Sequence, residues 1–472
     1  MKLSFRSLFL VFTIAAFIAC SNSSQINDNS LGNNSSGGEY DRRLLFSAPV
    51  ADPCQFKNLS ESPSPVIERV FSADRPRYES FQREYLTTPE IALKNWLMAT
   101  PTFTSARSID DFEFNRISER GAGHAGIYEV HLIQHPEHRF ILKVSTHESE
   151  AEHLWKLQNS IAGHPECLLR TNLGLSRVAT QEELAFFPKI PRVLEAANFP
   201  FDSPRDGVHY GGESATHRYP ILMEKVAGQA LASLNIDQPE TLNTYRTVGK
   251  SLGYFHYFMA ESPNSPFGQW ATITHGDLHA NNVFFDRSTN SVSFIDNDSM
   301  DRNNRLWYDF YQLGYLSFDY SINTGHSVLA PYLTELQNQE AGSRGMPLAS
   351  LFDWSRPAPT GKLHPQDAII GALERHEVIQ QIPHSPAFQE VAKRFSKFRA
   401  VAQGYSDAFP ENRRHEVREY FGQLCRNTAK RFIRDSFNRR SEDEPIEPRL
   451  NAAIRHLFPS EVIACMDENR FE

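Results

Sequence analysis

Short apolar stretches separated by turn residues fill the middle of the chain and predict a β-rich region. The expected strands cover residues 127–133, 139–144, 188–194 and 219–224. Residues 244–259 instead repeat their apolar side chains at the helical period, and His256 near the end of that helix is expected to be a core histidine. From about residue 301 onward the sequence predicts helices. The pattern therefore predicts an α+β fold, in which a small β-rich part precedes a larger, mainly helical part.

One helix is well marked ahead of the β-rich region. Thr88 is placed to be its N-cap, and Pro89 takes the first helical position, where a missing N–H is tolerated. Leu93, Trp96 and Leu97 then recur at the spacing that puts them on one helix face. We expect this face to pack against the outside of the domain that follows.

The start of the chain has the composition of a secretory signal. Lys2 and Arg6 precede an apolar run at residues 8–19, which is too short to span a membrane comfortably. Residues 17–20 are similar to a bacterial lipoprotein processing site, at which Cys20 would carry the lipid. Cleavage nearby without lipidation is the alternative. We therefore expect an exported protein, secreted or anchored as a lipoprotein, and a cytoplasmic one only if the signal is not used.

Composition also divides the rest of the chain. Residues 21–38 are rich in Ser, Asn and Gly, with too few apolar side chains to offset the entropy of ordering, so a disordered tether is expected. The predicted parts are a signal peptide at residues 1–20, the tether at 21–38, an N-terminal extension with one helix at 39–107, a β-rich domain at 108–227 and a helical domain at 228–472.

Charge and cysteine content limit the possible partners. A formal net charge of −9 argues against a general nucleic-acid binder, which would normally carry a basic surface. Membrane contact is expected only through a lipid on Cys20. The other cysteines are Cys54, Cys167, Cys425 and Cys465, which allow three pairings. A chain of 472 residues can bury a large core without disulfides, so free buried thiols are the favoured interpretation.

A polar motif between two expected strands carries the clearest chemistry. It reads His275-x-Asp277-x-x-x-x-Asn282, and Asp296 follows one short hairpin later. A carboxylate, an amide and a second carboxylate on neighbouring loops could receive the proton of a hydroxyl and hold Mg²⁺ on nucleotide phosphates. His275 and His279, with Asp277 between them, could instead bind a transition metal.

A glycine-rich stretch upstream is left unexplained by a transition-metal site. Gly121, Gly123 and Gly126 form a Gly-x-Gly-x-x-Gly pattern, which by itself also suits dinucleotide-binding folds. In those folds the loop opens a helix, whereas here a strand follows, then a turn at residues 135–138 and a second strand with Lys143. Glycines inside a β-hairpin let the backbone approach phosphates, and the lysine would place a cation near them.

A helix is expected at residues 148–157, directly after the strand that carries Lys143. Glu150 is the candidate to pair with this lysine, and Glu148 and Glu152 are its competitors. The three glutamates share one short helix, and the helical phase alone does not separate them.

In this order and spacing, the motifs resemble those of the aminoglycoside phosphotransferase and choline kinase superfamily, the small-molecule branch of the protein-kinase fold. The resemblance covers about residues 115–310, under half of the chain. It rests on the glycine pattern, Lys143, Glu150, residues 222–228, residues 275–283 and residues 295–296. It implies a two-lobed protein-kinase-like fold, with a small β-rich N-lobe and a larger, mainly helical C-lobe.

The resemblance also implies a role for each candidate residue. Asp277 would accept or orient the proton of the substrate hydroxyl, and His275 would shape the loop around it. Asn282 and Asp296 would hold Mg²⁺, and Asp309 would support the loop from the next helix. The implied nucleotide-binding residues are Gly121, Gly123, Gly126, Lys143, Glu150 and the linker residues Glu224 and Val226.

Departures from the protein-kinase pattern favour the small-molecule branch. Gly276 stands where protein kinases have Arg, and Asn297 and Asp298 replace the Phe and Gly that follow their metal-binding Asp. The implied activity is the ATP- and Mg²⁺-dependent transfer of the γ-phosphoryl group to a hydroxyl of a small polar molecule. A protein substrate and a catalytically silent pseudokinase that binds a partner are the alternatives, suggested by the long segments outside the resemblance.

Overall fold

The computed structural model describes residues 41–44 and 67–70, most of residues 84–313 and most of residues 386–467. Within these spans the larger gaps are residues 119–123, 147–149, 151–153, 159–179, 201–208, 261–265 and 437–457. The predicted signal, Cys20 and the predicted tether lie outside the described residues, as does most of the helix predicted at residues 148–157.

The chain divides into two compact units. The first comprises Met1–Ala51, Ser62–Asn159 and Pro191–Lys225, and the second comprises Asp52–Glu61, Ser160–Ile190 and Val226–Glu472. The described part of the first unit is built on a β-sheet, whereas that of the second is mainly helical. This confirms the predicted α+β class, in which a β-rich part precedes a helical one.

The first unit contains an antiparallel seven-stranded sheet with the order β2-β1-β6-β9-β5-β4-β3. Its strands are β1 (Asp41–Leu44), β2 (Ile67–Val70), β3 (Phe112–Ser118), β4 (His124–Leu132), β5 (His135–Ser145), β6 (Val193–Pro200) and β9 (His217–Glu224). A separate short hairpin is formed by β7 (His209–Tyr210) and β8 (Glu213–Ser214). The strands predicted at residues 127–133, 139–144 and 219–224 are thereby confirmed.

Two local predictions about this sheet are wrong. The turn predicted at residues 135–138 is the beginning of β5, and the turn itself is formed by Ile133 and Gln134. A register shift in the β4–β5 pair accommodates Pro136, which has no N–H for the ladder. The strand predicted at residues 188–194 begins only at Val193, because Pro188 and Pro191 interrupt the donors ahead of it.

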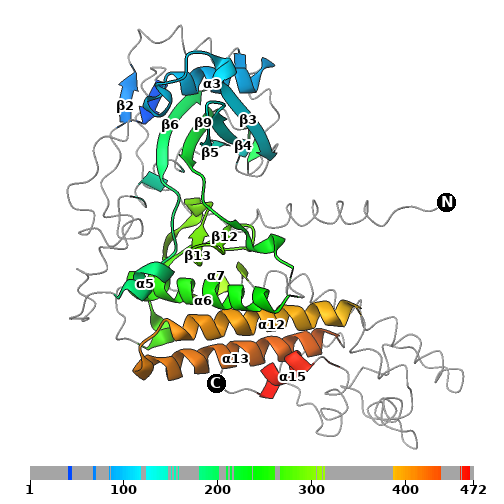
Figure 1. The fold of residues 1–472 in the computed structure, drawn as a ribbon. Helices are drawn as coiled ribbons and strands as arrows, with labels where there is room; N and C mark the ends of the chain where they lie inside the picture. The colour runs from blue at the N-terminus through cyan, green and yellow to red at the C-terminus, as the bar shows by residue number, and fades with distance from the viewer. Residues whose placement is uncertain are drawn as a thin grey trace, which may run out of the picture. The chain divides into compact units, whose positions relative to one another are not determined.

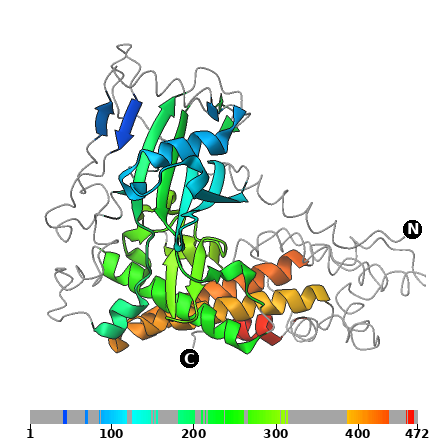
Figure 2. The same cartoon turned by 45° about the horizontal axis from the view of Figure 1, so that its top comes forward.

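The helix predicted in the N-terminal extension is α3 (Pro89–Met98), which packs on the sheet of the first unit (Figures 1 and 2). Leu93, Trp96 and Leu97 are buried in one core with side chains of β3, β4 and β5, as their spacing predicts. Thr88 takes the N-cap position, but its hydroxyl donates to the carbonyl of Glu84 at 3.2 Å and does not cap the helix.

The second unit combines long helices with two small sheets. Its described helices are α5 (Gln181–Phe186), α6 (Pro239–Met259), α7 (Leu306–Phe310), α12 (Pro386–Asp407), α13 (Glu411–Ser436) and α15 (Ser460–Asp467). One sheet contains β10 (Gln229–Ala230), β12 (Val283–Asp286) and β13 (Ser291–Phe294), and the other contains β11 (Thr272–Thr274) and β14 (Asp301–Asn303). Among the described helices, none is long and apolar enough to cross a membrane.

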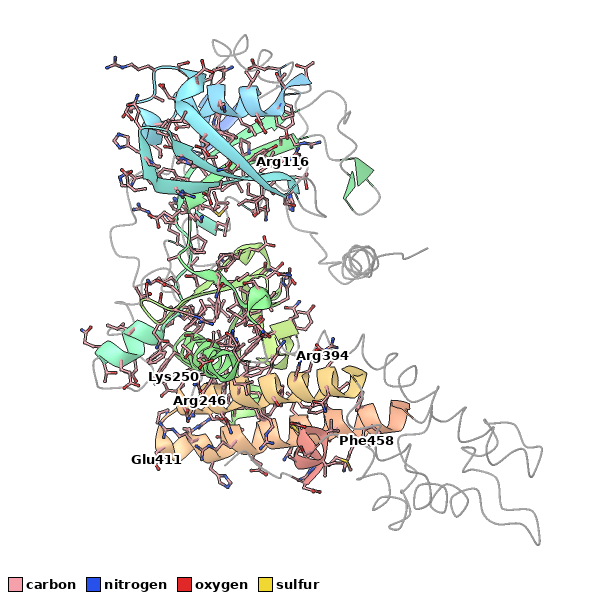
Figure 3. All side chains as sticks on the ribbon, turned by 45° about the vertical axis from the view of Figure 1, so that its right-hand side comes forward. Arg116, Arg246, Lys250, Arg394, Glu411 and Phe458 are labelled. Carbon is pink, nitrogen blue, oxygen red and sulfur yellow. A yellow bond between two sulfur atoms is a disulfide. The ribbon has the colours of Figure 1, made fainter. Side chains whose placement is uncertain are left out.

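Helices α6 and α12 pack so closely that their backbones touch. A Cβ atom on Gly404 would collide with the backbone carbonyl of Arg246, and one on Gly249 would collide with that of Val401. Glycine is therefore required at both positions, because any side chain would push the helices apart. Arg246, labelled in Figure 3, also reaches the end of α12, where its Nη2 lies 2.6 Å from Oδ2 of Asp407.

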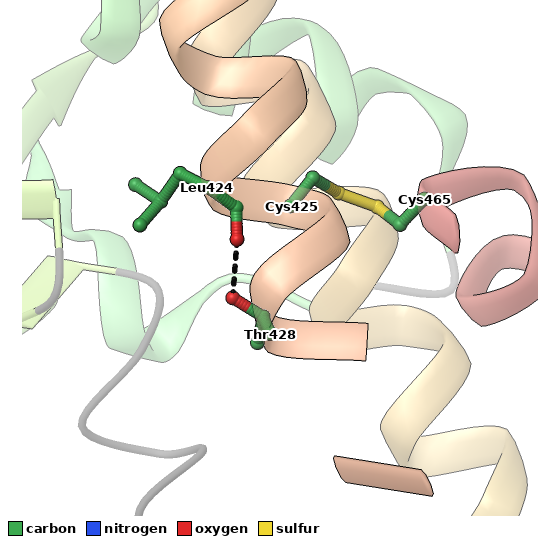
Figure 4. The surroundings of a disulfide bond; sticks show 4 residues. All are labelled: Leu424, Cys425, Thr428 and Cys465. Atoms are coloured by element: carbon green, nitrogen blue, oxygen red, sulfur yellow. Dashed lines mark hydrogen bonds between the residues drawn. A yellow bond between two sulfur atoms is a disulfide. The ribbon is translucent and has the colours of Figure 1, made fainter. Parts of the chain in front are cut away.

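A disulfide between Cys425 and Cys465 joins α13 to α15 (Figure 4). Because α15 packs on α13, the two Cα atoms lie 5.2 Å apart, within the range that a disulfide needs. The expectation of free thiols is wrong for this pair. Sequence spacing could not reveal it, since the pairing depends on how the helices pack. Cys54 and Cys167 lie outside the described residues.

Candidate active site

The loop of the polar motif, residues 275–282, connects β11 to β12 in the second unit. Gly276 has a φ of 79°, and a Cβ atom here would collide with the backbone carbonyl of Ser299. Both features exclude a larger residue, because only glycine adopts this conformation without strain and leaves room for the neighbouring chain. Gly276, which replaces the Arg of protein kinases, is thus required by the path of the backbone.

Asp309 on α7 holds the beginning of this loop. Its Oδ2 accepts the N–H of His275 at 2.8 Å, and its Oδ1 accepts the N–H of Gly276 at 2.9 Å. Oδ2 also accepts Nε2–H of His256 at 2.9 Å. Burial acts to raise the pKa of Asp309, but the hydrogen bonds from His256 and from the backbone N–H of His275 outweigh it, and the pKa lies below its usual value. The charged carboxylate therefore fixes two successive backbone groups, as the resemblance implies.

A buried chain of side chains continues behind Asp309. Nδ1 of His256, on α6, lies 3.0 Å from the hydroxyl of Tyr405, on α12. Burial raises the pKa of Tyr405, so its hydroxyl keeps its proton at neutral pH. The prediction that His256 is a core histidine is correct as to burial, but it missed the contact with Asp309. The sequence contains no local signal for Tyr405, which lies far along the chain.

His275 is a structural member of the loop. Its Nε2 lies 3.0 Å from the carbonyl of Ile295, to which it must donate, and its Nδ1 accepts the N–H of Asp277 at 3.3 Å. This pattern requires a neutral ring with the proton on Nε2. Burial lowers the pKa of His275, which favours the same state. Because both ring nitrogens are used, His275 cannot also ligate a transition metal, and the alternative metal site with His279 is ruled out.

Asp277 follows with a carboxylate that is 40 % exposed. Its Oδ1 accepts Nε2–H of Gln312 at 3.1 Å, and Nε2 of His279 lies 3.8 Å from its Oδ2. The backbone carbonyl of Asp277 accepts Nδ2–H of Asn282 at 2.9 Å. The sequence analysis missed Gln312, because it belongs to no motif and its partner lies 35 positions earlier in the chain.

Asn282 and the residue before Asp296 are joined by a backbone hydrogen bond, from the N–H of Ile295 to the carbonyl of Asn282 at 2.9 Å. Asp296 itself is left-handed, with φ 58° and ψ 52°, at the end of β13. Asn297 is buried and donates to the carbonyl of Phe294 at 3.1 Å. The two predicted magnesium ligands therefore lie just outside the same end of the paired strands β12 and β13.

The donor set of these residues fits Mg²⁺. The amide nitrogen of Asn282 is committed to the carbonyl of Asp277, so the amide presents its oxygen elsewhere. A carboxylate and an amide oxygen are hard ligands, which suit Mg²⁺ completed by water and phosphate. Among the described residues, no group of three or more His, Cys, Asp and Glu side chains could hold a metal ion.

In the first unit, Lys143 on β5 forms an ion pair with Glu150, with 2.5 Å between Nζ and Oε1. Both side chains are buried, with residue exposures of 8 % for Lys143 and 2 % for Glu150. The β4–β5 register places Lys143 opposite Ile127, the residue after Gly126. Gly126 and Lys143 therefore lie on one strand pair.

Of the three glycines predicted to bind the nucleotide, the structure describes Gly126. Gly121 and Gly123 lie outside the described residues, as do the competing Glu148 and Glu152. Gly126 lies under the ring of Tyr128, where a Cβ atom would come within 2.9 Å of a ring carbon. A residue with a side chain at this position would have to displace that ring.

The predicted linker follows β9. Glu224 ends that strand, its N–H donates to the carbonyl of Arg192 at 2.9 Å, and its Oε1 lies 2.8 Å from Nη2 of Arg192. Lys225 pairs with Glu129, which also binds Arg139. The boundary between the two units falls between Lys225 and Val226. The backbone N–H of Glu224 is thus already bonded to Arg192. Contacts of Glu224 and Val226 with adenine remain a prediction.

Comparison with known proteins returns kinases of the superfamily that the motifs resemble. No protein-family model matches the sequence, and a comparison with curated proteins finds no match. A thermostable mutant of aminoglycoside phosphotransferase APH(4)-Ia, solved as a ternary complex with ADP and hygromycin B, is 10 % identical over 77 % of this chain and 98 % of its own, with a TM-score of 0.27. The ethanolamine kinase Pv091845 of Plasmodium vivax is 10 % identical over 82 % of this chain and 95 % of its own, with a TM-score of 0.28. Likenesses at this level carry no argument about activity, which has to come from the residues themselves.

Proposed function

We propose that this protein is an ATP- and Mg²⁺-dependent phosphotransferase that moves the γ-phosphoryl group to a hydroxyl of a small polar molecule. The observation that carries the proposal is the loop of the second unit, which presents Asp277 beside the paired segments of Asn282 and Asp296. The ion pair of Lys143 and Glu150 in the first unit supports it, because a buried, fixed ammonium on the strand paired with that of Gly126 suits phosphates.

Phosphoryl transfer depends mainly on positioning and on stabilisation of charge. In the proposed reaction ATP supplies the phosphoryl group, and Asn282 and Asp296 would hold Mg²⁺, which would neutralise phosphate charge. Asp277 accepts or orients the proton of the acceptor hydroxyl. Asp309 keeps the loop in place through its bonds to two backbone N–H groups. Lys143, positioned by Glu150, provides a second cation for the phosphates.

We also propose that residues 108–227 form the N-lobe and residues 228–472 the C-lobe of a protein-kinase-like fold. The change of unit between Lys225 and Val226 supports the boundary between the lobes, whereas Ser160–Ile190 belong to the second unit. The nucleotide would be held by Gly121, Gly123 and Gly126 of the hairpin and by the linker backbone.

The proposal is tested by measuring ADP release from ATP and Mg²⁺ with a panel of hydroxyl acceptors that includes hygromycin B and ethanolamine. Asp277→Ala should lower turnover by about 10²–10⁴-fold, the usual contribution of a positioned acid or base. Stabilisation by ATP against thermal unfolding should persist in this variant, because Asp277 does not hold the nucleotide. Equal turnover in wild type and Asp277→Ala would refute the proposal.

The same measurements separate the alternatives. Stabilisation by ATP without ADP release from any acceptor would indicate a catalytically silent pseudokinase. Incorporation of labelled phosphate into added protein, but into no small molecule, would indicate a protein substrate. No stabilisation by ATP at all would contradict nucleotide binding itself.

We further propose that the protein is exported and that Cys20 is its lipidation site. The disulfide between Cys425 and Cys465 supports an oxidising compartment, because disulfides are rare in reducing cytosol. Mass spectrometry of the mature N-terminus after cell fractionation tests this proposal. A lipid-modified Cys20 is the expected result, and an unprocessed N-terminus in the cytoplasmic fraction would contradict export.

A further inference from the structure

Gln312 lies just beyond the end of α7 and is 7 % exposed. Both ends of its side-chain amide contact the loop of the polar motif. Its Oε1 accepts the N–H of Leu278 at 2.7 Å, and its Nε2 donates to Oδ1 of Asp277 at 3.1 Å. It is therefore bound to the backbone of one loop residue and to the carboxylate of the residue before it.

The orientation of this amide follows from its partners. The N–H of Leu278 can only donate, so it requires the oxygen of the amide. A charged carboxylate can only accept, so it requires the NH₂ group. Turning the amide by 180° would place a donor against a donor and an acceptor against an acceptor. The side chain of Gln312 is thus complementary to Asp277 and Leu278 in one orientation alone.

Gln312 differs from Asp309 in what it holds. Both side chains accept backbone N–H groups of the loop, Asp309 from His275 and Gly276 and Gln312 from Leu278. Of these two side chains, Gln312 is the one that also donates to the carboxylate of Asp277. The side chain of Gln312 therefore both holds the backbone at Leu278 and positions the carboxylate of Asp277. Suitable variants can separate the two contacts.

We propose that Gln312 is a positioning residue that fixes the carboxylate of Asp277 for catalysis. The inference rests on the proposed phosphotransferase function. With its orientation fixed by the amide N–H at Oδ1, the carboxylate of Asp277 receives the proton of the acceptor hydroxyl. As that O–H bond breaks, the hydroxyl oxygen forms its bond to the γ-phosphorus, and the bond from this phosphorus to the oxygen of ADP breaks. The products are the phosphorylated acceptor, ADP and one proton.

Two substitutions separate the functions of the amide. Gln312→Glu keeps the size of the side chain and an oxygen for the N–H of Leu278, but replaces the donor to Asp277 with an oxygen. Gln312→Met removes both hydrogen bonds at similar volume. Gln423→Met is the matched control, because Gln423 lies exposed on α13 and, among the described residues, its side chain donates only to Glu419 at 3.5 Å.

The experiment compares kcat, KM for ATP and stabilisation by ATP in the full-length variants. Both Gln312 variants should lose about 10- to 100-fold in kcat, the effect of a small misplacement of a reacting group. KM for ATP and the shift in Tm with ATP should stay at wild-type values, as should all three measurements in Gln423→Met. A merely structural residue would not produce this separation of kcat from nucleotide binding.

An unchanged kcat in Gln312→Glu would overturn the inference. So would loss of ATP binding or of folding in both variants, because Gln312 would then be a structural residue. Asp277→Ala distinguishes this failure from failure of the proposed function. If Asp277→Ala abolishes ADP release and Gln312→Glu does not, only the role of Gln312 is wrong. If Asp277→Ala has no effect, the proposed function itself is wrong.

Discussion

Replacing Asp309 with Asn should destabilise the second unit, although the side chain keeps its size. The carboxylate accepts three hydrogen bonds, two on Oδ2 and one on Oδ1, whereas an amide has one oxygen. If the amide oxygen takes the place of Oδ2, the NH₂ group faces the N–H of Gly276. If the amide turns round, His275 and His256 both lose their acceptor. At least one buried donor is therefore left unpaired.

An unsatisfied buried donor costs about 1–3 kcal/mol, and the remaining bonds lose the strengthening that a charged acceptor provides. Together these effects predict a loss of about 2–4 kcal/mol in the free energy of unfolding. For a unit of this size, the loss corresponds to a fall of roughly 4–16 °C in Tm. Asp407→Asn is the matched control, since it breaks a partly exposed ion pair with Arg246 and should cost no more than about 1 kcal/mol.

The effect should also depend on pH in a defined direction. The pKa of Asp309 is lower in the folded protein than its usual value of 3.8, so its contribution to stability is fully present above that value. This contribution is lost as pH falls through the lower pKa of the folded state. The difference in Tm between wild type and Asp309→Asn should therefore be largest near neutral pH and shrink in acid. A difference of less than about 1 kcal/mol at pH 7, in urea unfolding followed by circular dichroism, would refute this reasoning.

Three further predictions concern stability, and each is checked by thermal unfolding. Gly404→Ala should lower Tm by an amount equivalent to about 1–3 kcal/mol, because the added methyl group collides with a backbone carbonyl of α6; an unchanged Tm would show that the helices can separate freely. Lys143→Met should lower the free energy of unfolding by about 3–5 kcal/mol, because the carboxylate of Glu150 stays buried without its partner. Adding Glu150→Gln should recover part of this loss. A double variant no more stable than the single one would contradict the role of the ion pair. Reduction of the Cys425–Cys465 disulfide, which closes a 40-residue separation, should cost roughly 2–4 kcal/mol, and a double Ser variant should show the same loss without responding to reductant.

The sequence predicted features whose causes lie close together in the chain. The strands β4, β5 and β9 are marked by apolar runs with turn residues between them, and α3 is marked by its apolar spacing and Pro89. The polar loop was found because its residues fall within a few positions of one another. The predicted starts of β5 and β6 are wrong because of their prolines. A strand can contain a proline where its partner strand needs no N–H, as at Pro136 in β5, and a local sequence pattern does not show the partner strand.

The sequence did not predict the contacts that hold this loop. Gln312 reaches Asp277 across 35 positions, and Tyr405 reaches His256 across 149 positions. These contacts depend on the packing of α6 against α12 and on the place where α7 ends. The Cys425–Cys465 pairing likewise depends on α15 lying on α13. No residue type at these positions indicates its partner, so only the folded arrangement reveals them.

The glycine contact between α6 and α12 has a consequence for genetics. Because Gly404 and Gly249 leave no room for a methyl group, the hydroxyl of Tyr405 can approach His256 only while both remain glycine. A random screen for inactive alleles should therefore recover changes at these two codons beside changes at Asp277. Such alleles would lose the contact between Tyr405 and His256 while retaining every residue of the polar loop.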